Sequence, residues 1–215
     1  MRFLFLPGRL AVAAFVLATA LSLAGTARAQ TIIDEWNSVK PPPPPELKSV
    51  TVDPKTTALL VLDFLKPSCN ERKRPRCIAS IPKVRILLNQ ARAKAMLVVY
   101  SAYPGAKLAD TVPEVAPIAG EPVVVAQADK FIDTDLDKIL KDHRIKTVIV
   151  VGTAAQGAVL YTASDAALRG FGTIIPVDGM SADNTYFEQY VTYQFAHMPG
   201  VANRVTLTRV GMMSF

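Results

Sequence analysis

The chain has 215 residues, half of them hydrophobic, and a formal net charge of +6. This length suits one domain with a full hydrophobic core. Three of the positive charges, Arg2, Arg9 and Arg28, lie before residue 30, and without them the net charge is +3. Nucleic-acid binding needs Lys and Arg gathered on one face, so we expect no nucleic-acid partner.

Residues 1–29 have the pattern of a secretory signal peptide. A basic start that includes Arg2 precedes an uncharged apolar run over 10–23, and an Ala-Arg-Ala cleavage pattern ends at Ala29. The alternative is a transmembrane anchor, but the apolar run is shorter than the ~20 residues that span a bilayer. We therefore expect cleavage after Ala29, no membrane attachment afterwards, and a periplasmic or secreted protein.

Residues 30–55 are predicted to be a proline-rich lead-in to a single domain over 56–215. Five consecutive prolines occupy positions 41–45. Proline fixes φ and has no N–H, so this run is predicted to be a stiff polyproline spacer. It either holds the domain away from the N-terminus or lies across the domain surface, and a ligand for a proline-recognition module is the alternative.

Two cysteines, Cys69 and Cys77, enclose seven residues that include four Arg or Lys. In an oxidising compartment such a near pair usually forms a disulfide. A loop this short would stabilise the fold by about 2.5 kcal/mol. The alternative is that Cys69, six residues after Asp63, is a reactive thiol. The basic loop between the cysteines is either solvated or steers an anionic ligand.

Six short apolar runs alternate with segments of helical periodicity. The runs are 58–62, 96–100, 123–125, 148–151, 173–177 and 204–208. Continuous apolar strands are typical of a parallel sheet that is buried on both faces. The pattern predicts a Rossmann-like, three-layer αβα fold with a six-stranded, mainly parallel sheet. In such sheets the site lies beyond the carboxyl ends of the strands, and Asp63, Lys130 and Gly152 all follow strands.

Three segments share the spacing of a known family. Thr57–Phe64 matches an opening strand with its aspartate. Lys130–Leu136 matches a contracted form of K-x-x-x-[ST]-x-F-x-x-T-x-L. Gly152–Val159 matches G-x-x-T-x-x-C-V, with Ala158 at the cysteine position. With these segments the chain resembles the isochorismatase-like cysteine hydrolases over about residues 55–210.

The resemblance implies a catalytic mechanism. Asp63 would accept the thiol proton, Lys130 would stabilise charge, and the residue at position 158 would attack an amide or related carbon. The resemblance also implies a cis peptide between Thr153 and Ala154, and an oxyanion hole made by the N–H groups of Ala154 and Ala158. Ala158 has no nucleophilic atom, however, so the implied nucleophile is missing.

We expect no metal site and no cofactor. The metal-binding branch of the family, the nicotinamidases, has an Asp-x-His pair and a further His after the second strand. The corresponding stretch here, 100–105, contains no His, and the chain has only His143 and His197. Both lie in helical or helix-end contexts.

Three functions fit these observations. The first is a hydrolase with altered chemistry, in which Asp63 activates a water molecule. The second is a non-catalytic periplasmic protein that binds a small amide- or carboxylate-bearing molecule. The third is a structural role in a homo-oligomer. The presence of Asp63 and Lys130 favours a pocket that still binds a ligand. The absence of a thiol at position 158 favours binding of that ligand over its hydrolysis.

Overall fold

A computed structural model describes residues 30–215, and the compact domain spans Pro43–Phe215. The expected signal peptide, 1–29, lies outside the described residues. In the lead-in, the short helix α1 (Ile32–Glu35) has no buried residue. Among the described residues, no helix has the length and apolarity to cross a membrane.

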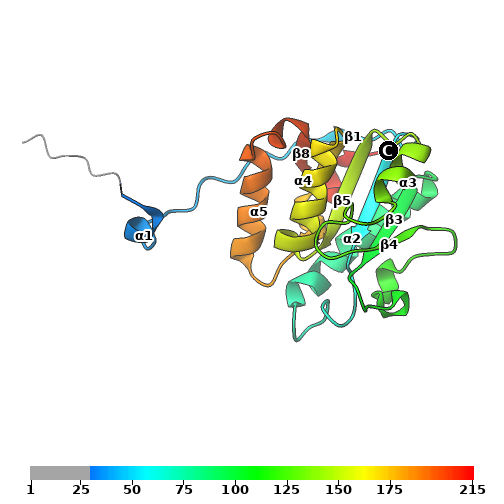
Figure 1. The fold of residues 1–215 in the computed structure, drawn as a ribbon, viewed down its shortest axis with the longest axis horizontal. Coiled ribbons are helices and arrows are strands. Elements are labelled where there is room, and N and C mark those ends of the chain that lie inside the picture. The colour runs from blue at the N-terminus through cyan, green and yellow to red at the C-terminus, as the bar shows by residue number, and fades with distance from the viewer. Residues whose placement is uncertain (1–29) are drawn as a thin grey trace, which may run out of the picture. The chain divides into compact units, whose positions relative to one another are not determined.

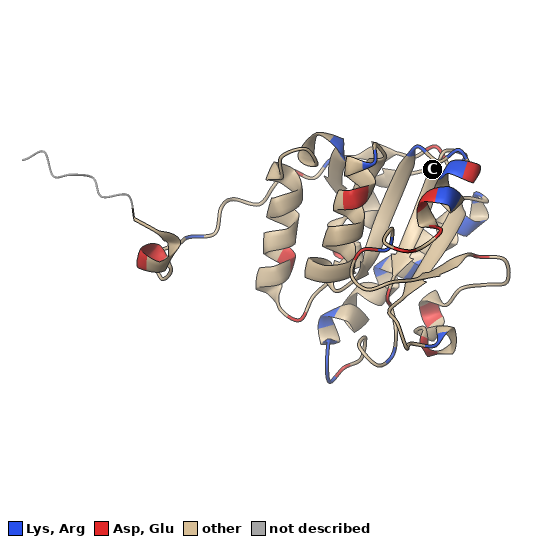
Figure 2. Cartoon of the chain, in the orientation of Figure 1, with Lys and Arg blue, Asp and Glu red and all other residues tan. Residues whose placement is uncertain are grey.

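The main sheet is parallel throughout, with strand order β4-β3-β2-β5-β6-β8 and with β7 paired to β5 (Figure 1). Its strands are β2 (Thr57–Leu62), β3 (Leu97–Ala102), β4 (Val123–Val125), β5 (Thr147–Thr153), β6 (Gly172–Pro176), β7 (Met180–Ser181) and β8 (Val205–Thr208). These strands contain no Lys, Arg, Asp or Glu, and the charged residues gather on helices and loops (Figure 2).

The predicted six-stranded sheet is wrong by one strand, because the sheet has seven. All six predicted strands form, with boundaries that shift by a residue or two. The seventh, β7, has only two residues and pairs with Gly152 and Thr153 at the carboxyl end of β5. Two residues are too few to show an apolar run, so the strand depends on this tertiary pairing.

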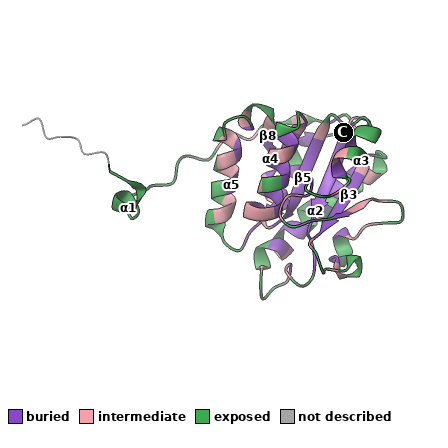
Figure 3. Cartoon of the chain, viewed as in Figure 1, coloured by how far each residue is buried: buried purple, intermediate pink, exposed green. Residues whose placement is uncertain are grey.

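Helices cover both faces of the sheet, which confirms the three-layer fold. Within β2, Leu60 and Leu62 belong to one hydrophobic cluster, whereas Leu59 and Val61 belong to the other. The first cluster contains residues of α3 (Leu136–Asp142), α4 (Leu160–Leu168) and α5 (Thr185–His197), and the second contains residues of α2 (Pro75–Ala93). Figure 3 shows buried strands between helices whose outer sides are exposed.

Short elements complete the domain. A separate two-stranded parallel sheet pairs β1 (Val50–Thr51) with β9 (Met213–Ser214). The helical turns are η1 (Leu108–Asp110), η2 (Pro113–Val115), η3 (Ala155–Val159), η4 (Val177–Gly179), η5 (Ala202–Arg204) and η6 (Val210–Met212).

The register of the central strands determines what meets at the carboxyl edge of the sheet. Leu62, the last residue of β2, pairs with Gly152 of β5 on one side and with Ser101 of β3 on the other. Asp63 follows Leu62 directly, so its side chain is placed between the ends of two neighbouring strands. The candidate site is built around this position.

Candidate functional site

Asp63 is held in place by its backbone and by both of its carboxylate oxygens. Its φ of 56° lies in the left-handed region, where Asp and Asn are enriched among non-glycine residues. Ser101 donates from its hydroxyl to Oδ1 at 2.7 Å, and the Lys130 ammonium lies 2.8 Å from Oδ2. Only 7% of Asp63 is exposed. The carboxylate is therefore a fixed, nearly dry acceptor.

Lys130 is completely buried, and all of its donors are used. Its Nζ donates to the carbonyl oxygens of Ala126 at 2.9 Å and Gln127 at 2.6 Å, and it pairs with Asp63. An ammonium group has three N–H donors, so these three acceptors satisfy it. The backbone N–H of Lys130 donates to Thr162 of α4 at 3.1 Å, which ties the loop to that helix.

Burial and charge act on Asp63 in opposite directions. Removal from water raises the pKa of the Asp63 carboxyl above its ordinary value of 3.8, because burial disfavours the charged form. The Lys130 charge and the hydrogen bonds from Lys130 and Ser101 lower the pKa against this. Each charge thus stabilises the other, because an unpaired charge in this buried position would raise the free energy of the folded state.

The turn after β5 is the second part of the site. The peptide bond between Thr153 and Ala154 is cis. The Ala154 carbonyl accepts from Gly157 N–H at 3.0 Å and from Val159 N–H at 3.3 Å, which opens η3. Ala158 lies in this turn, is 4% exposed, and packs in the first hydrophobic cluster. A methyl group therefore occupies the position at which the resemblance implies a nucleophile.

The predicted disulfide between Cys69 and Cys77 is confirmed. The chain has two cysteines, and both are in this bond. The alternative of a reactive thiol at Cys69 is therefore wrong in this structure. The oxidised loop also contains the basic residues that precede α2.

Arg74, which the sequence indicated only as part of the basic loop between the cysteines, connects this loop to the turn after β5. It precedes α2, donates from Nη1 to the Thr153 hydroxyl at 2.9 Å, and donates from Nε to Asp183 at 2.7 Å. Arg76 likewise pairs with Glu188 of α5. The basic loop is thus partly neutralised by acids about 110 positions away, a relation that no local pattern reveals.

Ser101, the partner of Asp63, was also missed, although a signal was present. It is a polar residue near the end of an otherwise apolar strand, Leu97–Ala102. A hydroxyl at the carboxyl end of a central parallel strand is well placed to reach a neighbouring strand end. Attention to polar residues that interrupt the apolar runs would have added Ser101 to the candidate list.

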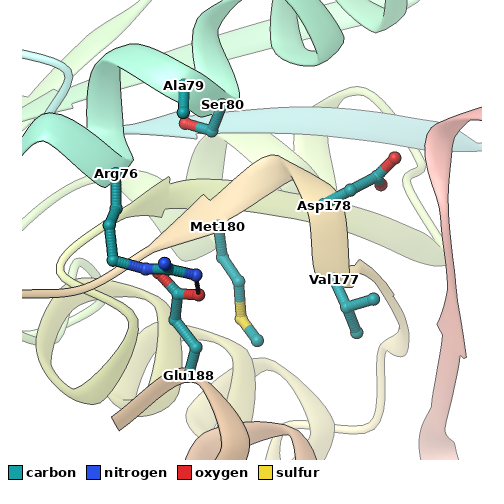
Figure 4. A pocket seen from close by; sticks show the side chains of 7 residues that line it. All are labelled: Arg76, Ala79, Ser80, Val177, Asp178, Met180 and Glu188. Carbon is teal, nitrogen blue, oxygen red and sulfur yellow. Dashed lines mark hydrogen bonds and ion pairs between the residues drawn. The ribbon is translucent and has the colours of Figure 1, made fainter. Parts of the chain in front are cut away.

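Two cavities lie near the ends of the strands. One, of about 280 Å³, lies between α2, η4, β7 and the start of α5 (Figure 4). The residues that line it are Arg76, Ala79, Ser80, Val177, Asp178, Met180 and Glu188. The Arg76–Glu188 ion pair closes one side, and the Asp178 carboxylate binds the Val210 N–H at 2.9 Å. A second cavity, of about 430 Å³, lies beside the loop that carries Lys130.

Neither histidine has a neighbourhood suited to a metal. The Nδ1 of His143 hydrogen-bonds to the Ile139 carbonyl, and the Nδ1 of His197 to the Tyr193 carbonyl, each within one helical turn. Across residues 30–215, no group of three or more His, Cys, Asp or Glu side chains is arranged to hold a metal ion. The expected absence of a metal and of a cofactor remains a prediction.

Fold and site together define a class. The chain has a Rossmann-like parallel sheet between helix layers, with a buried Asp–Lys pair and a cis peptide at its carboxyl edge, as the resemblance to the isochorismatase-like hydrolases implies. The sequence profile of the Isochorismatase domain matches residues 57–207. The chain belongs to the isochorismatase family, which confirms the resemblance.

Two characterised relatives share part of the sequence. N-carbamoylsarcosine amidase from an Arthrobacter species is 43% identical over 63 residues, which cover 29% of this chain and 24% of the amidase. The secreted isochorismatase effector Isc1 of Verticillium dahliae is 32% identical over 113 residues, which cover 47% of this chain and 60% of the effector. The chain thus spans less than two thirds of either relative.

Solved structures share the fold. An isochorismatase-like hydrolase from Alkaliphilus metalliredigens aligns with a TM-score of 0.65 at 24% identity, covering 73% of this chain and 95% of that one. N-carbamoylsarcosine amidase from Thermoplasma acidophilum aligns with a TM-score of 0.61 at 24% identity, covering 72% and 96%. At these identities the alignments support the architecture alone.

The lysine segment departs from the family spacing in an instructive way. Phe131, Thr134 and Leu136 fit F-x-x-T-x-L without a gap, which places Val125 where the motif has its lysine. Lys130 comes from a position five residues later, yet its Nζ reaches Asp63. The charge pair is therefore retained although the lysine has a different place in the loop.

Proposed function

We propose that this chain binds a small amide- or carboxylate-bearing molecule at the carboxyl edge of its sheet and does not hydrolyse it through a thiol. The observation that carries the proposal is the absence of a reactive thiol. Ala158 presents a methyl group, and both cysteines are in a disulfide. Loss of a nucleophile that acts in a catalytic unit costs on the order of 10⁶ in rate.

The state of Lys130 supports binding over turnover. A cation that stabilises an oxyanion needs a donor free to meet the charge as it develops. The three donors of Lys130 are used by Asp63, Ala126 and Gln127. The pair therefore stabilises the edge of the sheet, and a water-based hydrolysis that relies on Lys130 would first have to break these contacts.

The test combines binding and turnover on one panel of small amides and carboxylic acids. Thermal shift measures binding by wild-type protein, and ammonia release measures hydrolysis of the amides. We expect at least one compound to raise the Tm, and no ammonia release above the buffer rate. Steady ammonia release that iodoacetamide abolishes would contradict the proposal, as would a panel that leaves the Tm unchanged.

A second experiment asks whether the turn still favours a thiolate. Ala158→Cys adds one free thiol to a chain whose other two cysteines form a disulfide. The start of a helical segment lowers a cysteine pKa from ~8.5, and burial among apolar side chains acts against this. We expect the pH profile of iodoacetamide alkylation to give a lower pKa than that of Ser38→Cys in the exposed lead-in. Equal pKa values would mean that the turn no longer supports thiol chemistry.

We also propose that the chain is exported and begins at Gln30 after cleavage. The pattern of residues 1–29 supports this, as does the disulfide, which is typical of oxidising compartments. One relative, the Verticillium dahliae effector, is described as secreted. Mass spectrometry of the protein from periplasm or medium should give an N-terminal peptide that starts at Gln30, and an intact N-terminus there would refute cleavage.

A further inference from the structure

The second cavity has an apolar lining that is open to solvent. It measures about 430 Å³, within the range of small-molecule sites. Three of its lining residues are large and exposed, namely Val125 at 52%, Ile132 at 58% and Tyr161 at 56%. They come from the end of β4, from the Lys130 loop and from α4. Apolar side chains from three separate elements thus border one hollow.

The charged groups of this cavity are both acidic. Asp129 and Asp133 line it, and no Lys or Arg does so among the described residues. Lys130, between them in sequence, is completely buried and its ammonium binds Asp63 and two carbonyls. The nearby Arg169 forms an ion pair with Asp165, and its guanidinium lies over the face of the Phe131 ring. The cavity therefore offers negative charge on a chain that is positive overall.

Asp129 is fixed in position. Its Oδ1 accepts the Phe131 N–H at 2.9 Å, and the Asp165 carboxyl group lies within hydrogen-bond reach of the Asp129 carboxyl group. Burial raises the pKa of Asp129 above its ordinary value of 3.8, and the neighbouring Asp165 acts in the same direction. A positively charged ligand group would relieve both effects, since it favours the ionised carboxylate.

From this arrangement we infer that the cavity binds a small organic cation with an apolar body, such as an aromatic or aliphatic amidine or amine. The apolar body contacts Val125, Ile132 and Tyr161, and the cationic group faces Asp129 and Asp133. The Tyr161 ring adds a surface that attracts a cation. This inference goes beyond the proposed function, because Asp63 and Ala158 do not line the cavity and its charge favours cationic ligands over carboxylates.

Three nearly isosteric probes separate charge from shape. Benzamidine, benzamide and benzoate share a planar skeleton and carry charges of +1, 0 and −1 at pH 7. We expect affinity for the mature wild-type protein, measured by NMR titration, to fall in that order, with about tenfold between benzamidine and benzoate. Amide shifts should map to residues around the cavity, and Tyr161→Ala should weaken both benzamidine and benzamide, benzamidine by the larger factor because the ring also attracts its charge.

Variants test whether the two carboxylates cause the preference. Asp129→Asn/Asp133→Asn keeps the side-chain shapes and should bring the benzamidine-to-benzoate ratio close to one. The matched control, Glu114→Gln/Asp142→Asn, removes the same charge at exposed positions outside the cavity lining and should leave the ratio unchanged.

The outcomes distinguish this inference from the proposed function. Benzoate binding as tightly as benzamidine, a preference that survives the Asp129 and Asp133 substitutions, or no benzamidine binding at millimolar concentration would each overturn the inference. The proposed function fails separately, if the wider panel of amides and carboxylic acids leaves the Tm unchanged or shows thiol-dependent hydrolysis.

Discussion

Asp63 and Lys130 place two opposite charges where water is nearly absent. Burying each charge is costly, and the ion pair repays the cost only because the remaining donors and acceptors are also satisfied. Ser101 binds the other oxygen of Asp63, and two carbonyls bind the rest of the ammonium. This completeness explains how two buried charges are accommodated at the edge of the sheet, since removing one partner would leave the other uncompensated.

We predict that either single substitution is strongly destabilising and that the effects are not additive. Asp63→Asn keeps a residue that tolerates the left-handed backbone but leaves Lys130 charged and unpaired, and Lys130→Met leaves Asp63 unpaired. Each should lower the free energy of unfolding by about 3 kcal/mol. The double variant should lose clearly less than the sum.

Urea unfolding of the four proteins measures this cycle, and an exposed pair provides the control. Lys138 and Asp142 form an ion pair on α3 with side chains 71% and 57% exposed. Lys138→Met should therefore change the free energy of unfolding by less than about 0.5 kcal/mol. Additive losses at Asp63 and Lys130 would show that their contact contributes no coupling.

Among the elements, β2 and β5 approach each other closely at the site. A Cβ on Gly152 would lie 2.6 Å from the Leu62 Cβ and 2.8 Å from the Leu62 carbonyl oxygen. Backbone atoms cannot move aside as a flexible side chain does. The glycine thus permits the strand spacing that puts Asp63 beside the turn after β5.

Gly152→Ala should lower the free energy of unfolding by about 3 kcal/mol, through overpacking against a neighbouring backbone. Gly211→Ala is the control, because a Cβ there meets nothing within 4 Å, and its effect should stay within about 0.5 kcal/mol. Chemical denaturation of both variants measures the difference. If the Gly152→Ala and Gly211→Ala variants were equally stable, β2 and β5 could move apart to admit the methyl group without loss of stability.

The disulfide loop, residues 69–77, runs into the first turn of α2 and also shapes the site. Its cysteines are buried, at 2% and 0% exposure, and Arg74 within it contacts Thr153. Replacing both cysteines, as Cys69→Ala/Cys77→Ala, removes the cross-link from the unfolded chain. We expect a loss of about 2.5 kcal/mol in denaturant unfolding at equilibrium.

A matched measurement on reduced wild-type protein separates the cross-link from packing. The reduced protein keeps both sulfur atoms and should lose nearly as much stability as the double variant. A double variant as stable as oxidised wild type would show that the loop is held by its Arg–carboxylate contacts alone.

For the whole molecule, strands from opposite ends of the domain pair with each other. β1 and β9 join residues 50–51 to residues 213–214, and the Val52 N–H donates to the Ser214 carbonyl at 2.8 Å. Met213 is buried in the second hydrophobic cluster, and Phe215 packs against it. The last residues of the chain therefore contribute to the core.

Truncation at the two ends of the chain should affect the free energy of unfolding very differently. Deleting Met213–Phe215 removes β9 and the burial of Met213, and should lower the free energy of unfolding by about 2 kcal/mol. Starting the chain at Pro43 instead of Gln30 removes residues 30–42, which are exposed, and should change the free energy of unfolding by less than about 0.5 kcal/mol. Thermal unfolding of both truncated proteins at equal concentration tests this, and similar Tm losses would contradict it.

Local patterns in the sequence were enough to predict the architecture and several residues of the candidate site. Apolar runs and helical periodicity are local signals, so they predicted six strands and three layers. Asp63, Lys130 and the turn after β5 were predicted as site residues because they follow apolar strands. The disulfide was predicted because its two cysteines are close along the chain. The family spacing placed Ala158 where the resemblance implies a nucleophile.

The contacts between these parts could not be predicted from the sequence, because they join residues that are far apart along the chain. Ser101 lies 38 positions from Asp63, and Arg74 lies 79 from Thr153. The strand β7 exists only because β5 pairs with it, and the saturation of Lys130 depends on how its loop folds back on two carbonyls. Hydrogen bonds and ion pairs form between groups that the fold brings within about 3 Å, and no local pattern encodes that distance.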